Sequence, residues 1–342
     1  MRLAVIANLT ARDGKAAKFW PKVHAHMLER GLEVQVHETQ HVGHAAEIAH
    51  SLKDSEDIDL VVAMGGDGSV HEVASGLRGS EMRLGIIPTG TGNDYARAHA
   101  IPLKDIPGMV SILIEGVDRH AGALRLEGRP AAAHTLYPAP ASNPWDGEPR
   151  DSRDVVRWVF LESDGGVTSA VSRMKTEGRA KRIRGSMKYT WLGIVSIFGW
   201  KRRKAWIRID DEPGRLVDLA GLYCCCMCET FGGGYRVAPG THPMQGHGTL
   251  VMAYGLSKFK MLNLMGPLRK GRHVGKWGIT LQSVRRFEIR AVDESDEPTD
   301  EPHEHTVWIQ ADGEPCMTTP ACLEFHADQI WVRGAKSIPN LD

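Results

Sequence analysis

The first hundred residues alternate between strand-like and helix-like segments, and this order restricts the fold more than any other feature. Residues 3–8, 59–64 and 84–88 are short, mostly apolar runs without alternation, which is typical of strands buried on both faces of a sheet. Apolar residues recur at helical spacing between them, for example in residues 16–27. Strands separated by helices predict a doubly wound parallel sheet covered on both faces.

The second half of the chain has a different pattern. A segment rich in proline and alanine, residues 129–154, shows no period and predicts an exposed loop or insertion. Strand-like pieces separated by turn signals follow it, and they predict a mainly β region, a β-sandwich. The pieces are residues 155–162, 204–210, 219–228, 249–256, 283–291, 306–314 and 322–332.

The composition excludes several classes of protein. Lysine plus arginine and aspartate plus glutamate number 42 each, so no overall field favours nucleic acid as a partner. The cysteine-rich stretch "YCCCMC" (223–228) fits no zinc pattern and predicts reduced, buried strand cysteines, as expected in the cytoplasm. No apolar run approaches the roughly 18 residues that span a bilayer, although the protein could still lie on a membrane surface.

Two glycine-rich turns follow successive apolar strands. In "GGDGSVHE" (65–72), the glycines allow a tight turn, and backbone N–H groups near Ser69 and Val70 begin a helix that would point at an anion. In "GTGND" (90–94), Thr91 adds a hydroxyl, and Asn93 and Asp94 begin another helix. Carboxyl ends of parallel strands meet at one edge, so the two turns predict a two-walled phosphate cradle. Neither turn is a Walker A loop or the G-x-G-x-x-G dinucleotide fingerprint.

These two stretches resemble the diacylglycerol kinase catalytic family, which includes sphingosine and ceramide kinases and bacterial lipid kinases. Further similarity lies in "IANLTARDGKA" (6–16), "HETQHVGHAAEIA" (37–49), "FGGGYRVAPG" (231–240) and "QADGEP" (310–315), in family order. The resemblance implies an ATP-binding α/β domain at residues 1–120 and a lipid-binding β-sandwich at 121–320. Residues 321–342 would form a tail that packs back on the first domain.

The resemblance also implies site residues and cofactors. ATP with Mg²⁺ would contact Asn8, Thr39, Gly65, Gly66, Asp67, Gly68, Ser69, Val70, His71, Glu72, Gly90, Thr91, Gly92, Asn93 and Asp94. Asp67 would act near the γ-phosphate and hold the metal, because a carboxylate beside phosphates needs a cation or a proton. Asp312 and Glu314 would complete the catalytic set, with one of them accepting the proton of the lipid hydroxyl.

Two departures from the family pattern bear on these expectations. Glu162 stands where the family usually has asparagine in a strand, and His247 replaces an aspartate that bacterial members use for a structural magnesium. That metal site is therefore in doubt, whereas the catalytic landmarks are intact and indicate an enzyme.

The expected function is a lipid kinase that converts diacylglycerol to phosphatidic acid, because Gly65 and Asp94 distinguish this chain from sphingosine kinases. A sphingoid-base or ceramide kinase and a non-catalytic nucleotide-binding protein remain alternatives. The apolar residues 189–200, with Trp191 and Trp200, lie between basic clusters, one of them "KRRK" (201–204), with Trp206 just beyond. This segment predicts either contact with an anionic membrane or a core helix with solvated ends. We expect a cytoplasmic protein attached peripherally to its membrane. The sequence does not decide the oligomeric state, and a homodimer is one alternative.

Overall fold

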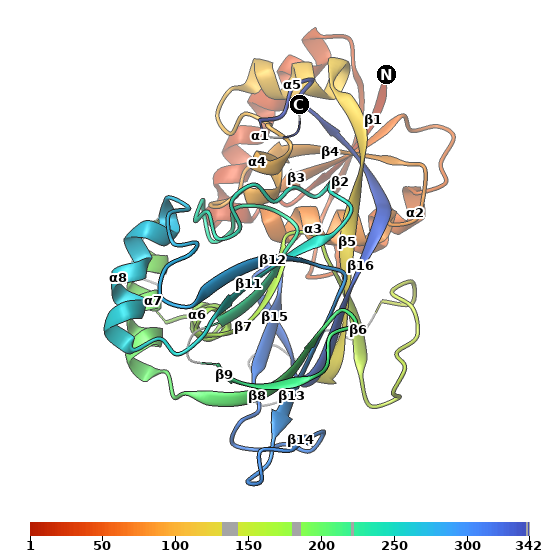
Figure 1. Cartoon of the computed structure of the whole chain (residues 1–342). Coiled ribbons are helices and arrows are strands. Elements are labelled where there is room, and N and C mark those ends of the chain that lie inside the picture. The colour runs from red at the N-terminus through yellow and green to blue at the C-terminus, as the bar shows by residue number, and fades with distance from the viewer. Residues whose placement is uncertain (132–142, 180–185, 220–221, 340, 342) are drawn as a thin grey trace. The chain divides into compact units, whose positions relative to one another are not determined.

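The computed structural model describes residues 1–131, 143–179, 186–219, 222–339 and 341, and its chain forms two units (Figure 1). Unit 1 comprises Met1–Ala123, His242–Gly246 and Ala327–Asp342, and unit 2 comprises Leu124–Thr241 and His247–His326. Two long strands, β5 (Val117–Pro130) and β16 (Glu314–Gly334), contribute residues to both units. The predicted domain bounds at residues 120 and 320 stay predictions.

Unit 1 has the strand–helix alternation that the sequence predicts. Its strands are β1 (Arg2–Ala7), β2 (Glu33–Glu38), β3 (Leu60–Gly65) and β4 (Arg83–Pro88). Its helices are α1 (Ala11–Glu29), α2 (His44–Leu52), α3 (Asp67–Leu77), α4 (Asp94–Ala98) and α5 (Ile106–Glu115). Every residue of β3 is buried, which explains why its sequence is apolar without alternation.

The strand order of unit 1 determines where a ligand can bind. The strands pair in parallel in the order β2-β1-β3-β4, and the end of β16 continues the sheet beside β4. Because the chain moves from β1 to β2 in one direction and then returns to β3 and β4, right-handed connections put α1 on one face and α2 and α3 on the other. The connections leave β1 and β3 in opposite directions along the sheet. A doubly wound sheet binds ligands at such a switch point, beyond the carboxyl ends of the two strands.

Unit 2 is built mainly from antiparallel strands, which confirms the predicted second fold class. One run of strands has the order β12-β11-β10-β7-β15-β16, while β16 also pairs with β13, β13 with β8, and β8 with β9. The bounds are β6 (Val155–Val159), β7 (Glu162–Gly166), β8 (Arg203–Ile209), β9 (Arg215–Leu219), β10 (Leu222–Cys226), β11 (Gly248–Ala253), β12 (Ile279–Val284), β13 (Arg286–Val292), β14 (Pro298–Thr299) and β15 (Trp308–Ala311).

Three helices accompany these strands: α6 (Val167–Thr176), α7 (Ser186–Gly199) and α8 (Lys258–Arg269). Side chains of α7 and α8, among them Ile197 and Leu264, enter a core cluster with Cys224 and Cys226 of β10. The clustered cysteines are buried free thiols, as predicted. Among the described residues, no helix is both long enough and apolar enough to cross a membrane. Much of the loop predicted at 129–154 falls on residues 132–142, outside the described residues.

Candidate functional site

Predicted site residues follow the carboxyl ends of three neighbouring strands of unit 1. Asn8 comes directly after β1, Thr39 after β2, and the turn at Gly66 after β3. Backbone bonds hold these strand ends together: the Asn8 N–H donates to the Met64 carbonyl at 3.0 Å, and the Thr39 N–H donates to the Ala7 carbonyl at 3.1 Å. The Asn8 amide also donates to the Ser69 hydroxyl at 3.3 Å, so the end of β1 is tied to the first turn of α3.

The two glycine turns pack directly against each other. A Cβ atom added to Gly90 would lie 2.4 Å from the Gly66 Cα, and one added to Gly66 would lie 3.1 Å from the Gly90 Cα. Both are closer than the roughly 3.5–4.0 Å of an ordinary carbon contact, so side chains here would separate the turns. A Cβ on Gly68, by contrast, would meet nothing within 4 Å. Gly66 and Gly90 therefore serve the packing of the turns, whereas Gly68 exposes backbone.

Asn93 braces the second turn. Its side-chain oxygen accepts the Gly90 N–H at 2.8 Å, and its side-chain nitrogen donates to the Gly90 carbonyl at 3.0 Å. Its backbone is left-handed, with φ 54° and ψ 42°, a conformation that asparagine adopts more readily than most residues. The structure therefore gives this side chain a local bracing role, and its predicted contact with ATP stays a prediction.

Asp67 is the first residue of α3 and links the two turns. Its carboxylate accepts the N–H of Tyr95, in α4, at 3.1 Å. Burial, and then the negative charge of Asp94, raise the pKa of Asp67 to about 6, although N–H donors from residues 93–95 oppose this shift. A carboxylate next to a second buried acid and close to neutral pKa is suited to a nearby cation or to a proton-transfer role.

Two other residues that are predicted to contact ATP also make hydrogen bonds within or between the helices. The Val70 N–H donates to the Gly66 carbonyl at 3.1 Å and the side chain is buried, so Val70 serves α3. The Glu72 carboxylate accepts the Ala45 N–H, in the first turn of α2, at 3.2 Å. His71 and Thr91 keep exposed surface, and the Gly92 carbonyl accepts the Arg97 side chain at 3.4 Å.

Asp312 and Glu314 lie in unit 2, in the turn between β15 and β16. The two carboxylate oxygens of Asp312 accept the backbone N–H groups of Phe160, Leu161 and Glu162 at 2.9–3.0 Å. These bonds fix the chain between β6 and β7, so the carboxylate has a structural task that the sequence did not reveal. Glu314 is exposed.

Comparisons with known proteins place this arrangement in a family. The model of the diacylglycerol kinase catalytic domain matches residues 2–126, and that of the YegS C-terminal NAD kinase beta sandwich-like domain matches residues 163–333. A diacylglycerol kinase from Bacillus subtilis (strain 168) is 37% identical over 294 residues, which cover 84% of this chain and 85% of that protein. The chain belongs to the diacylglycerol kinase family.

Two further proteins of this name share less sequence identity with the chain. A diacylglycerol kinase from Mycobacterium tuberculosis (strain ATCC 25618 / H37Rv) is 24% identical over 282 residues, or 80% of each chain. The crystal structure of a diacylglycerol kinase from Bacillus anthracis str. Sterne superposes with a TM-score of 0.64 at 14% identity and covers 98% of each chain. That structure supports the shared fold.

Glu162, in β7, belongs to a buried acidic cluster. The Gln310 amide nitrogen donates to Glu162 at 2.6 Å and to Asp164 at 2.8 Å, and its amide oxygen accepts the Gly313 N–H of the Asp312–Glu314 turn. Burial raises the pKa of Asp164 to about 7 and that of Glu162 well above its ordinary value. The cluster therefore favours the protonated form of its carboxyl groups, and it supports the turn through Gln310.

Sequence reasoning missed a histidine of unit 1 that lies beside α4. His99 is fully buried, its ring lies 4.8 Å from that of Tyr95, and burial lowers its pKa to about 3. The side chain of His242 donates to the Ala98 carbonyl at 2.8 Å, which attaches residues 242–246 to this helix. Nothing in the spacing of these residues indicates that they meet.

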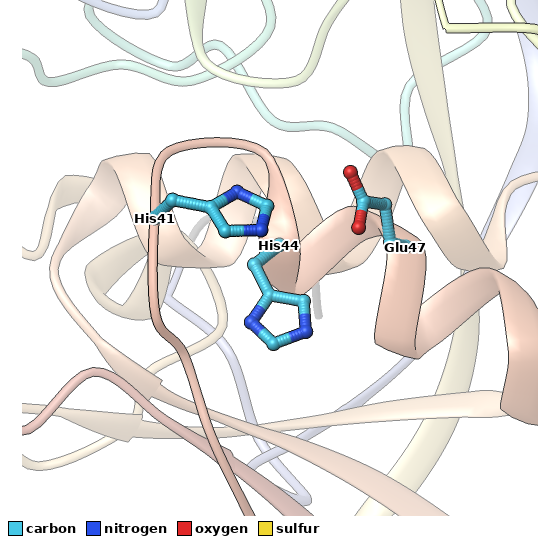
Figure 2. Close-up of side chains that lie close together, drawn as sticks. All are labelled: His41, His44 and Glu47. Atoms are coloured by element: carbon cyan, nitrogen blue, oxygen red, sulfur yellow. The ribbon is translucent and has the colours of Figure 1, made fainter.

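A surface cluster of potential metal ligands lies at the start of α2 (Figure 2). His41, His44 and Glu47 have ligand atoms within 4.8 Å of one another. However, the two imidazoles stack at 4.7 Å with 17° between their planes, and His44 Nδ1 accepts the Gln40 N–H at 3.0 Å. Stacked rings do not converge on one ion, so this geometry supports no metal role. His247 belongs to no such cluster among the described residues.

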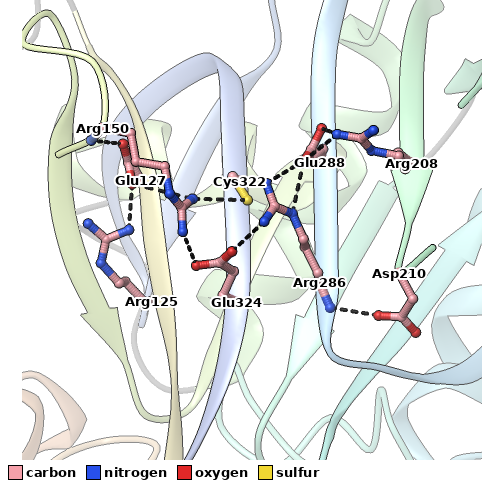
Figure 3. A network of polar contacts seen from close by, with 9 residues as sticks. All are labelled: Arg125, Glu127, Arg150, Arg208, Asp210, Arg286, Glu288, Cys322 and Glu324. Carbon is pink, nitrogen blue, oxygen red and sulfur yellow. Dashed lines mark hydrogen bonds and ion pairs between the residues drawn. The ribbon is translucent and has the colours of Figure 1, made fainter.

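Unit 2 also contains a polar cavity of about 270 Å³, which lies beside a network of ion pairs between arginines and glutamates (Figure 3). Arg286 contacts Glu288 at 2.6 Å and Glu324 at 2.7 Å, and Arg150 pairs with the same Glu324. The lining holds equal numbers of arginines and acids, so it has no surplus charge for an ionic ligand. The network ties β16 to β13 and to the segment that carries Arg150. The lining residues are Glu127, Arg129, Arg150, Asp151, Asp154, Arg208, Arg286, Glu288, Arg290, Asp300, Pro320, Ala321 and Cys322.

Proposed function

We propose that the protein is an ATP-dependent lipid kinase that phosphorylates the hydroxyl of a membrane lipid, with diacylglycerol as acceptor and phosphatidic acid as product. The observation that carries the proposal is the pair of glycine turns at the carboxyl edge of the parallel sheet, with Asp67 between them. The names of the relatives support the same acceptor.

The first turn of α3 fits the phosphates of ATP. Three features combine there: the open space beside Gly68, the N–H groups at the start of an 11-residue helix, and the positive end of the helix dipole. The neighbouring Asn8 and Ser69 side chains are bonded to each other, so they hold this edge in a fixed form. A phosphate could then approach bare backbone without displacing side chains.

The acids of the same site fit Mg²⁺, which takes oxygen ligands and is usually held by one or two carboxylates together with substrate phosphates. Asp67 and the buried Asp94 supply such oxygens. Bound Mg²⁺ would neutralise charge on the transferring phosphoryl group. In this chain, Asp67 would orient the cation, and the N–H of Tyr95 would fix its carboxylate.

The acceptor hydroxyl must lose a proton, and three acids are candidates for the base. The sequence favours Asp312, or failing it Glu314, with Asp67 as the alternative. The three N–H groups that bind the Asp312 carboxylate weaken its case, because they commit both oxygens to the backbone. Within this proposal, we assign the role to Glu314, whose carboxylate is exposed.

The test is an assay of purified protein with Mg·ATP and a panel of acceptors, namely diacylglycerol, ceramide, sphingosine and NAD, with the products resolved by mass spectrometry. We expect phosphatidic acid. Turnover of sphingosine or NAD without turnover of diacylglycerol would contradict the proposal, and nucleotide binding without any product would favour a non-catalytic protein. Within the same proposal the protein is cytoplasmic and binds its membrane peripherally, and a homodimer stays a prediction.

A further inference from the structure

Helix α7 presents large apolar side chains to solvent along one stripe. Trp191, Ile194 and Phe198 are 43%, 37% and 56% exposed, and their spacing of three and four residues places them on the same face of the helix. Leu192 and Ile197, on the other side, are buried. The helix therefore has a second apolar face in addition to the one that packs into unit 2.

Helix α8 extends this exposed apolar surface. Phe259 is 77% exposed near its start, between Lys258 and Lys260. The Lys258 ammonium donates to the Phe198 carbonyl at 2.5 Å, so the start of α8 lies against the end of α7, as Figure 1 also shows. We call the side chains of Trp191, Ile194, Phe198 and Phe259 the α7–α8 face.

The chain around the α7–α8 face is strongly basic. Residues 186–209 and 254–278 contain no aspartate or glutamate, although the whole chain has a net charge of zero. Each segment carries six lysines and arginines: Lys188, Lys201, Arg202, Arg203, Lys204 and Arg208 in the first, and Lys258, Lys260, Arg269, Lys270, Arg272 and Lys276 in the second. Within the described part of the chain, none of the six in the second segment forms an ion pair.

In the first segment, several basic residues already have partners within the protein. Lys204 is paired with Asp296 at 2.6 Å, Arg202 contacts Asp218 at 3.5 Å, and Arg203 donates to the Glu304 carbonyl. Trp200 packs against the core, and Trp206 lies on β8 within 5.8 Å of two arginines. Of the three tryptophans expected at a membrane, Trp191 therefore belongs to the α7–α8 face, and the basic residues without an ion pair in the described part of the chain include those of 254–278.

We propose that the α7–α8 face docks on an anionic lipid bilayer, with its apolar side chains in the interface and the surrounding lysines and arginines against the headgroups. Exposed aromatic rings settle at the membrane interface, and basic residues are attracted to anionic lipid. A second copy of this chain fits less well, because it would oppose one basic surface to another. Docking would bring the enzyme to a water-insoluble acceptor, and this consequence alone rests on the proposed function.

The test is co-sedimentation with vesicles of phosphatidylcholine alone or mixed with phosphatidylglycerol, in the absence of nucleotide and acceptor. We expect binding to the mixed vesicles that falls with added salt. The triple variant Trp191→Gln, Phe198→Gln and Phe259→Gln should bind at least about tenfold more weakly, because apolar insertion contributes to interfacial affinity. Leu216→Gln is the matched control, since Leu216 is 44% exposed on β9 of the same unit. Circular dichroism and thermal unfolding check that each variant is folded.

A charge variant keeps the proposal falsifiable if the triple variant does not fold. Lys260→Glu with Lys276→Glu should weaken binding to mixed vesicles at least about tenfold, because each basic residue near the surface adds to the attraction. Lys18→Glu with Lys22→Glu, both exposed on α1, changes the net charge equally and should leave binding near that of the parent. The proposal would be overturned if a folded variant of the α7–α8 face bound mixed vesicles as tightly as the parent protein does. It would also be overturned if the parent protein did not bind mixed vesicles.

Activity distinguishes docking from the kinase function. The triple variant should phosphorylate a short-chain, water-dispersed diacylglycerol as the parent does but lose activity on the same lipid in vesicles. If the parent binds mixed vesicles and the variant does not, while neither phosphorylates any acceptor, the proposed function fails and the docking inference stands.

Discussion

Replacing Gly90 by alanine should destabilise unit 1 through a single added carbon. The new Cβ would lie 2.4 Å from the Gly66 Cα and 2.8 Å from the Asn93 side-chain oxygen. Gly90 does not have a positive φ, so alanine meets no backbone strain and the whole effect is steric. The Gly66 Cα is a backbone atom, so it cannot rotate away from the new methyl group as a flexible side chain would.

The magnitude follows from these distances. Restoring a contact of about 3.5 Å between the two carbons requires the turns to separate by about 1 Å. Overpacking of this kind costs roughly 1–3 kcal/mol of unfolding free energy. The displacement also strains the bonds between Asn93 and Gly90, which brace the second turn. We therefore expect a loss of about 2 kcal/mol and a weaker affinity for an ATP analogue.

Gly68→Ala is the matched control for stability alone, because its Cβ meets nothing within 4 Å and the residue lies in α3, whereas the open space beside it belongs to the proposed phosphate site. Alanine is a better helix former than glycine, so this variant should be as stable as the parent or more stable by up to about 1 kcal/mol. Urea unfolding followed by circular dichroism measures both variants, and isothermal titration calorimetry measures binding of the analogue. A Gly90→Ala protein with parental stability and affinity would refute the close packing of the two turns.

Three further predictions concern carboxyl groups. Asp94→Asn should lower the pKa of Asp67 from about 6, since the charge of Asp94 raises it, and carbon-detected NMR titration of ligand-free protein would show an unchanged value if this coupling is absent. Burial raises the pKa of Asp164 from an ordinary 3.8 to about 7, so the free energy of unfolding should fall as the pH rises between these values. Asp164→Asn should make the free energy of unfolding, measured with urea, less dependent on pH in this range. Asp312→Asn should lower the free energy of unfolding by roughly 1–3 kcal/mol, because an amide nitrogen would face backbone N–H donors. Glu314→Gln should leave stability unchanged but lower kcat, and the opposite ranking in unfolding and kinase assays would exchange the two roles.

The sequence predicted the alternation of strands and helices in the first hundred residues of unit 1, because this pattern is local. A strand buried on both faces must be apolar throughout, as residues 60–64 are, and a helix that covers a sheet must repeat its apolar residues every three to four positions. Glycines that follow such strands mark the carboxyl edge, so the sequence alone predicts that the two turns lie at the same edge of the sheet. Helices α6 and α8 of unit 2 were not predicted, because short helices among strands lack a long period.

The roles of individual side chains were decided by tertiary contacts. Gly66 and Gly90 are 24 positions apart, and only the folded sheet shows that their backbones touch. The Asp312 carboxylate accepts N–H groups of residues 160–162, about 150 positions away, and only the folded chain reveals these bonds. The sequence by itself determined the order of elements, the glycine turns and the family, because these depend on residue type and spacing. Which groups are exposed, paired or held depends on atoms that meet only after folding, and the tertiary structure alone decided them.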